Sequence, residues 1–190
     1  MTVLNQSVVH YLIDTRMSQF TVQAFASGLI SAVAHSPRIA IRDWKGGAHF
    51  APGTLKDARL DVKVNAASLE VLDELRDQDR RELQRVMNDE VLETARFREI
   101  VFESTVIHAD QLKADLYRLN VDGRLSLHGV TNSQSFLGQV AFGVDTLRAY
   151  GEFTLLQSDY SIRIASIAGA TLKLQDELKF TFYVIARKQA

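Results

Sequence analysis

The segment at residues 123–131, Gly-Arg-Leu-Ser-Leu-His-Gly-Val-Thr, constrains the fold more than any other part of the sequence. Its apolar and polar residues alternate, which points Leu125 and Leu127 to one face of a strand and their polar neighbours to the other. Gly129 then ends the strand, because glycine adopts turn conformations that residues with a Cβ avoid. Similar alternation recurs along most of the chain and predicts a sheet that closes around an apolar interior.

Alternation of this kind predicts roughly eight antiparallel strands. The Gly46-Gly47 pair between two such segments predicts a hairpin turn. We expect these strands within ten segments that favour extended structure, at residues 16–24, 38–45, 60–64, 99–106, 115–128, 135–142, 150–156, 161–166, 171–174 and 178–186.

The pattern changes at residues 68–92, where apolar residues such as Leu72, Leu75, Leu83 and Val86 recur at helical spacing among many charges. This segment predicts an amphipathic helix with a break near its middle. Its apolar stripe packs on the barrel by default. The alternatives are a lid over the barrel mouth or a dimer surface.

Composition limits the class of protein. The chain has 190 residues, which predicts a single domain over residues 1–190, and its net charge of −1 argues against nucleic acid or an anionic membrane as a partner. Cysteine is absent, which excludes disulfides and thiolate chemistry. No apolar run is long enough to span a bilayer. The first residues lack a signal-peptide pattern, so we expect a cytoplasmic protein, or a periplasmic one if a leader has been removed.

The strand pattern alone leaves a barrel or a sandwich open. Aromatic residues lie mainly on the predicted inner faces, which favours a closed barrel with an apolar lumen. The same alternation would also fill a small barrel with side chains and leave no cavity.

Several motifs, in order along nearly the whole chain, resemble the YceI-like polyisoprenoid-binding family. The resemblance implies a mainly β fold, an extended antiparallel lipocalin-like β-barrel with a helical insertion, whose lumen takes an isoprenoid chain. It also implies a bacterial-type protein and makes a homodimer plausible. The motifs lie at residues 25–35, 77–82, 91–97, 100–104, 123–131, 157–162 and 176–178.

Three segments depart from the pattern of the family that this chain resembles. Ser36-Pro37 stands where many similar sequences carry Asp-His, which argues against a metal or catalytic site in that loop. Arg98 stands where proline is common. The residues at 132–134, Asn-Ser-Gln, replace a more usual basic-Pro-Val.

A polyisoprenoid can be held only by burial of its apolar chain. Each buried CH₂ contributes ~0.8 kcal/mol, so an apolar lumen reaches micromolar affinity with about ten such groups. The resemblance to the family implies that the ligand is an isoprenoid or another long-chain amphiphilic lipid, and we expect no cofactor and no catalytic residue. The predicted lining residues are the inward members of alternating strands: Phe20, Val22, Ile41, Val64, Ile100, Phe102, Leu119, Leu125, Leu127, Phe153, Phe180 and Phe182.

Two histidines, His35 and His128, adjoin turns and are candidates for binding a ligand head group at the barrel mouth. Each could instead hold a loop by bonding a backbone carbonyl. None of the five histidines has the spacing of a metal site, and no nucleophile elbow is present. Two rival functions stay open. An enzyme would use His35 or His128 as acid or base in the same cavity, and an interaction module would have a filled barrel and an exposed apolar helix surface.

Overall fold

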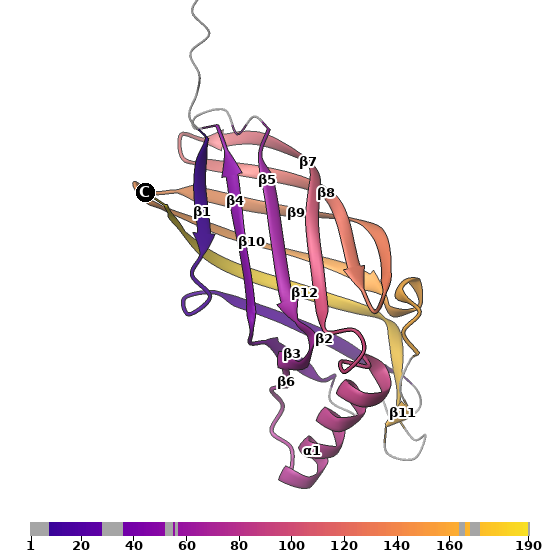
Figure 1. Cartoon of the computed structure of the whole chain (residues 1–190). Helices are drawn as coiled ribbons and strands as arrows, with labels where there is room; N and C mark the ends of the chain where they lie inside the picture. Colours follow the sequence, from indigo (N-terminus) through magenta and orange to yellow (C-terminus); the bar gives the residue numbers. More distant parts are fainter. Residues whose placement is uncertain are drawn as a thin grey trace, which may run out of the picture.

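Eight antiparallel strands close a barrel within the part of the chain that the computed structural model describes, residues 8–27, 36–51, 55, 57–163, 166–167 and 172–189 (Figure 1). Each strand pairs with the next, and the last pairs back with the first. The predicted mainly β barrel is confirmed. In order around the barrel the strands are β1 (Val9–Ile13), β4 (Trp44–Phe50), β5 (Arg59–Asn65), β7 (Glu99–Lys113), β8 (Leu116–Leu127), β9 (Val130–Phe142), β10 (Thr146–Leu156) and β12 (Leu172–Lys188).

The remaining described strands extend the sheet from β12 at one end of the barrel. They follow the order β2 (Gln19–Ser27), β3 (Arg38–Ile41) and β6 (Leu69–Val71), while β11 (Ser166–Ile167) pairs with β12 alone. Short 3-10 turns at Ala66–Ser68 and Gln157–Tyr160 connect strands at this end.

The barrel closes along a short seam between β1 and β12. Three residue pairs form this ladder, from Tyr11 opposite Lys188 to Ile13 opposite Ala186, whereas β10 and β12 are joined by eleven. Just beyond the seam, Arg187 Nε donates a hydrogen bond of 3.0 Å to the Asp14 carboxylate. This bond lowers the pKa of Asp14.

The turn predicted at Gly129 is confirmed. His128 and Gly129 form a two-residue connection between β8 and β9, with φ angles of 51° and 77°. Positive φ at both positions is the geometry of a tight hairpin turn that matches the twist of the strands. A Cβ on Gly129 would also lie 2.6 Å from Cε1 of Phe97, so glycine is required here for space as well as for conformation.

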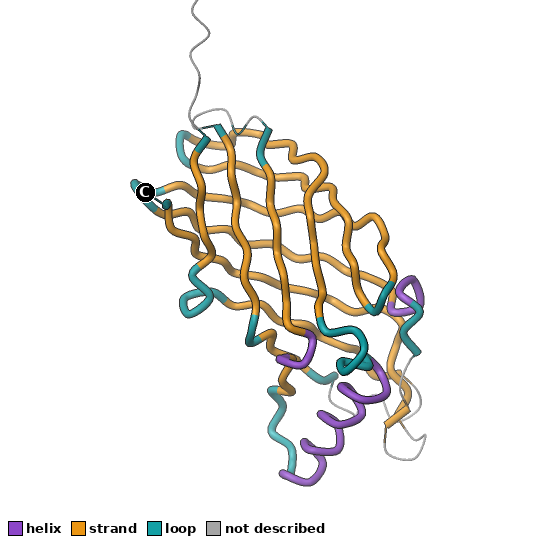
Figure 2. Tube along the Cα trace, viewed as in Figure 1, coloured by secondary structure: helices purple, strands orange, loops and turns teal. Residues whose placement is uncertain are grey.

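A helical segment covers one end of the barrel, which we call the helical end (Figure 2). Helix α1 (Asp77–Val86) continues through a wider π-type turn at Met87–Val91. Within the described residues, no helix is long and apolar enough to cross a membrane.

The prediction of a helix over residues 68–92 was wrong in its first part. Leu69–Val71 is strand β6, paired with β3, and the helix begins only at Asp77. Leu69 fits helical spacing with Leu72, but it also alternates with Val71 as in a strand, and pairing with β3 decides between the two.

The hairpin predicted at Gly46-Gly47 was also wrong, because both residues lie inside β4. A Cβ on Gly46 would lie 2.5 Å from the carbonyl oxygen of Asp61 on the neighbouring strand. Close approach of two strands, and not a turn, therefore explains this glycine. The residues predicted as separate strands at 171–174 and 178–186 belong, where described, to the continuous strand β12, which has an irregularity between Leu174 and Leu178.

Candidate ligand-binding site

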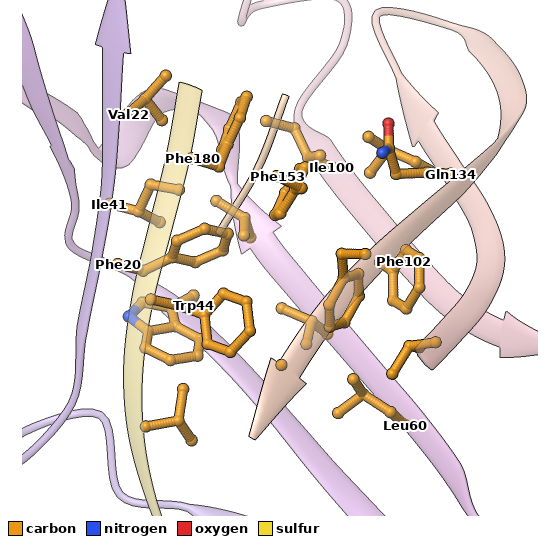
Figure 3. A pocket seen from close by; sticks show the side chains of 18 of the residues that line it. Phe20, Val22, Ile41, Trp44, Leu60, Ile100, Phe102, Gln134, Phe153 and Phe180 are labelled. Carbon is orange, nitrogen blue, oxygen red and sulfur yellow. The ribbon is translucent and has the colours of Figure 1, made fainter. Parts of the chain in front are cut away.

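An apolar cavity of about 280 Å³ runs through the barrel interior (Figure 3). Strands from both sides of the barrel contribute to its wall, and residues of α1 and the following π-type turn close its helical end. The lining is hydrocarbon apart from five residues that carry polar side-chain atoms. These five are Trp44, Arg59, Gln134, Gln139 and Gln157.

All twelve apolar residues predicted to face the lumen line this cavity. Alternation correctly identified the inner face of every strand concerned, because side chains of a barrel strand point in and out in turn. Whether each residue contacts a ligand stays a prediction. The twelve are Phe20, Val22, Ile41, Val64, Ile100, Phe102, Leu119, Leu125, Leu127, Phe153, Phe180 and Phe182.

Aromatic rings form a connected cluster within the wall. Phe153 and Phe180, on adjacent strands β10 and β12, stack with ring centroids 4.7 Å apart. The ring of Phe136 on β9 lies 5.7 Å from that of Phe153 and 5.5 Å from that of Phe182. Such contacts hold the rings in defined positions, so the wall is shaped by packing before any ligand arrives.

Four aromatic members of the wall were absent from the predicted lining: Trp44, Phe50, Phe136 and Phe142. Phe136 lies within a predicted strand and shares the inward direction of Val140. Trp44 lay next to the turn wrongly predicted at Gly46-Gly47, so its strand and its direction were misjudged. Its ring packs edge-on against Phe20 with centroids 5.6 Å apart.

A second aromatic group fills the end of the barrel opposite α1. Tyr11 stacks on Phe50 with centroids 5.4 Å apart, and Phe142 packs edge-on against Phe50 at the same distance. Burial raises the pKa of Tyr11, and the negative charge of Asp145 raises it further. Phe50 and Phe142 of this group border the cavity at that end.

The helical end is closed by apolar side chains and held by one glutamine. Leu83, Met87 and Leu92 line the cavity at this end. Gln84 Nε2 donates a hydrogen bond of 2.6 Å to the carbonyl oxygen of Leu69, and Gln84 Oε1 accepts one of 3.4 Å from the Val71 amide. The side chain of Gln84 therefore ties α1 to the edge strand β6.

His128 lies outside the residues that line the cavity, and its predicted contact with a ligand head group at the barrel mouth stays a prediction. Its side chain packs against the ring of Phe97, with centroids 4.3 Å apart, and its Nδ1 lies 3.2 Å from the carbonyl oxygen of Tyr160. Nε2 is buried and has no hydrogen-bond partner among the described residues, and it lies 4.0 Å from Glu93 Oε1. These contacts fit the alternative interpretation, in which the histidine holds loops together. His35 lies outside the described residues.

The lining contains no histidine and no carboxylate within the described part of the chain. Residues 8–27, 36–51, 55, 57–163, 166–167 and 172–189 also hold no group of three metal-ligating side chains. The side chains whose pKa departs from its usual value, such as Tyr160, whose pKa is raised by burial and by Asp159, lie outside the wall. The wall is therefore built for contact with hydrocarbon.

The comparison with family models decides the relationship of this chain to known proteins. The model of the YceI-like domain matches residues 11–186. The chain belongs to the YceI-like family. No match to this YceI-like chain was found among curated protein sequences.

Solved structures of three proteins share the fold at low sequence identity. BcnA of Burkholderia cenocepacia is 14% identical with a TM-score of 0.71, over 91% of this chain and 98% of that one. A domain from Saccharophagus degradans described as polyisoprenoid binding is 14% identical with a TM-score of 0.68, over 94% and 98%. The YceI protein of Campylobacter jejuni is 17% identical with a TM-score of 0.60, over 80% and 85%.

Proposed function

We propose that this protein is a non-catalytic carrier that holds an isoprenoid or another long-chain amphiphilic lipid in the barrel lumen. The observation that carries the proposal is the continuous apolar wall of the cavity, formed by aromatic and aliphatic side chains from most strands of the barrel. The description of the Saccharophagus degradans domain as polyisoprenoid binding supports the same ligand class.

The energetics of burial suit this role. About ten buried methylene-sized groups contribute roughly 8 kcal/mol before the cost of ordering the ligand is deducted. A flexible hydrocarbon chain has no other strong means of being recognised. The rings of Phe153 and Phe180 are already stacked in place, so little side-chain freedom remains to be lost on binding.

The two rival functions receive less support from the site. An enzyme that used a histidine in the lumen needs an imidazole in the wall, and the described lining has none. An interaction module with a filled barrel needs the cavity to be absent, and needs an apolar surface on the helix. The apolar residues Leu83 and Val86 of α1 instead face the cavity.

Native mass spectrometry of protein purified without detergent tests the carrier proposal. We expect a bound lipid at a fixed ratio per chain, released by organic extraction, or a stable complex after incubation with polyprenols and isoprenoid quinones. An unchanged apo mass after both treatments contradicts the proposal.

A pair of variants separates lumen binding from adsorption on the surface. Ala149→Phe places a ring in the cavity wall, and Val144→Phe places the same ring at a site that is 93% exposed. We expect the first to reduce lipid occupancy at least tenfold and the second to leave it unchanged. Thermal unfolding of both variants verifies that they are folded.

A further inference from the structure

Gln134 places an amide side chain in the cavity wall on the inner face of β9 (Figure 3). Gln134 has the same direction as Phe136, Gly138 and Val140, which alternate with exposed residues such as Leu137. Its inward direction therefore follows from the strand register that the turn at Gly129 sets.

The hydrogen bonds of Gln134 determine which end of its amide is free. Nε2 donates to the carbonyl oxygens of Ser135, at 3.0 Å, and Thr154, at 3.4 Å. Carbonyl oxygens are acceptors only, so the atom that bonds to them is the amide nitrogen. Among the described residues, no N–H or O–H group donates a hydrogen bond to Gln134 Oε1.

An amide oxygen without a donor becomes costly when hydrocarbon covers it, because it then loses its bonds to water. Gln134 Oε1 is not fully buried within the protein, and the residue borders the cavity. A ligand in the lumen would cover this oxygen, and it would bind best if it supplied a donor.

The other polar residues of the wall differ from Gln134. Gln157 Nε2 bonds the carbonyl oxygen of Gln175 at 2.9 Å, and Arg59 is exposed at the start of its strand. Gln139 has the outward parity of Leu137 on β9. The indole of Trp44 lies across the pocket from Gln134 in the view of Figure 3.

The wall also lacks charge that could neutralise an anion. Apart from the exposed Arg59, no lysine, arginine or histidine borders the cavity in the described part of the chain. A phosphate or carboxylate drawn into the lumen would lose its hydration without gaining a partner. A hydroxyl group needs one acceptor, and Gln134 provides it.

The position of Gln134 is supported by neighbouring rings. Gln134 pairs across the sheet with Gly123 on β8, and a Cβ on Gly123 would overlap the ring of Phe102. Phe102 therefore lies over the strand beside Gln134, and Phe136 lies 5.5 Å from Phe102 between ring centroids. These rings place apolar side chains of the cavity wall beside Gln134.

We infer that Gln134 Oε1 accepts a hydrogen bond from the hydroxyl group of an uncharged lipid alcohol and holds that group inside the barrel. The inference rests on the proposed lipid-carrier function and names the polar group that the carrier selects. The hydrocarbon chain of the ligand then occupies the remaining apolar wall.

The test compares three ligands that share one fifteen-carbon chain: farnesol, its methyl ether and farnesyl diphosphate. The ether keeps the chain and the oxygen but removes the donor, and the diphosphate replaces the hydroxyl with charge. Titration calorimetry is done on the wild type, on Gln134→Met, and on Leu137→Met as a control at a 62% exposed position of the same strand. We expect the wild type and Leu137→Met to prefer the alcohol over the ether by about five- to tenfold, the equivalent of one hydrogen bond.

For Gln134→Met we expect the alcohol and the ether to bind equally, with ether affinity within about twofold of that of the wild type. Equal binding of alcohol and ether by the wild type would overturn the inference while leaving the carrier function standing. So would a preference that survives in Gln134→Met, or tighter binding of the diphosphate. Failure of the wild type to bind any of the three would overturn the carrier function together with the inference.

Discussion

Single residues control how the wall of the lumen is shaped, and glycine does so as much as phenylalanine. Gly151 on β10 pairs with Phe182 on β12 and with Gly138 on β9. A Cβ on Gly151 would lie 2.6 Å both from the carbonyl oxygen of Leu137 and from Cζ of Phe182. The absence of a side chain therefore lets the ring of Phe182 lie against the strand instead of projecting into the cavity.

We predict that Gly151→Ala destabilises the protein by about 1–3 kcal/mol, the usual cost of overpacking a well-packed interior. The backbone oxygen of Leu137 cannot move as freely as a side chain, so the strain falls partly on the ladder itself. Urea unfolding measures the change. Gly143→Ala is the control, because its nearest contact is the side-chain hydroxyl of Thr146 at an exposed site. An equal loss of stability in both variants would contradict the argument.

Gln134 shows what sequence reasoning missed at the same scale. The predicted lining was limited to apolar side chains. Gln134 was therefore left out, although it shares the inward direction of Phe136. Two features of the sequence indicated this position. Gln134 lies two residues before the inward Phe136, and the residues at 132–134, Asn-Ser-Gln, differ from the basic-Pro-Val that is more usual in similar sequences. The hydrogen bonds that leave Oε1 free depend on Thr154 of another strand, which no local pattern specifies.

At the scale of elements, strands were predicted better than the helix and its borders. Alternation is a local property, so it located the inner faces of β7, β8 and β12 without knowledge of their partners. The start of α1 was misplaced because residues 69–71 become a strand only through pairing with β3. The turn predicted at Gly46 was wrong because, in a sequence, a glycine required for close contact between strands resembles a glycine required for a turn.

The side chain of Gln84 joins helix α1 to the edge strand β6 by two hydrogen bonds. We predict that Gln84→Ala costs about 1–2 kcal/mol, because the Leu69 carbonyl and the Val71 amide lose a partner at a partly buried site. Hydrogen exchange should increase across residues 77–91 more than in β8 or β9. Arg81→Ala, at an exposed position of the same helix, should change stability by less than about 0.5 kcal/mol. Unchanged exchange in Gln84→Ala would show that the glutamine does not hold the helix.

At the scale of the whole molecule, the aromatic group at one end and the helix at the other limit the length of ligand that fits. The cavity of about 280 Å³ is near the lower bound of ~300–1,000 Å³ typical of ligand pockets. Since each isoprene unit adds hydrocarbon to be buried, affinity should increase with chain length only while space remains.

We predict that affinity for isoprenoid alcohols increases by at least tenfold per unit up to about two or three units and then levels off. Calorimetric titration with alcohols of one to five units measures this. A further increase at four and five units would show that the helical end opens and that the volume seen here is smaller than that of the loaded barrel.

The short ladder between β1 and β12 has a mechanical consequence. Tension across that line is carried by three residue pairs, and tension across the line between β10 and β12 by eleven. A barrel that is pulled apart should therefore separate more readily between β1 and β12 than between β10 and β12. The ion pair between Asp14 and Arg187 lies next to the ladder between β1 and β12.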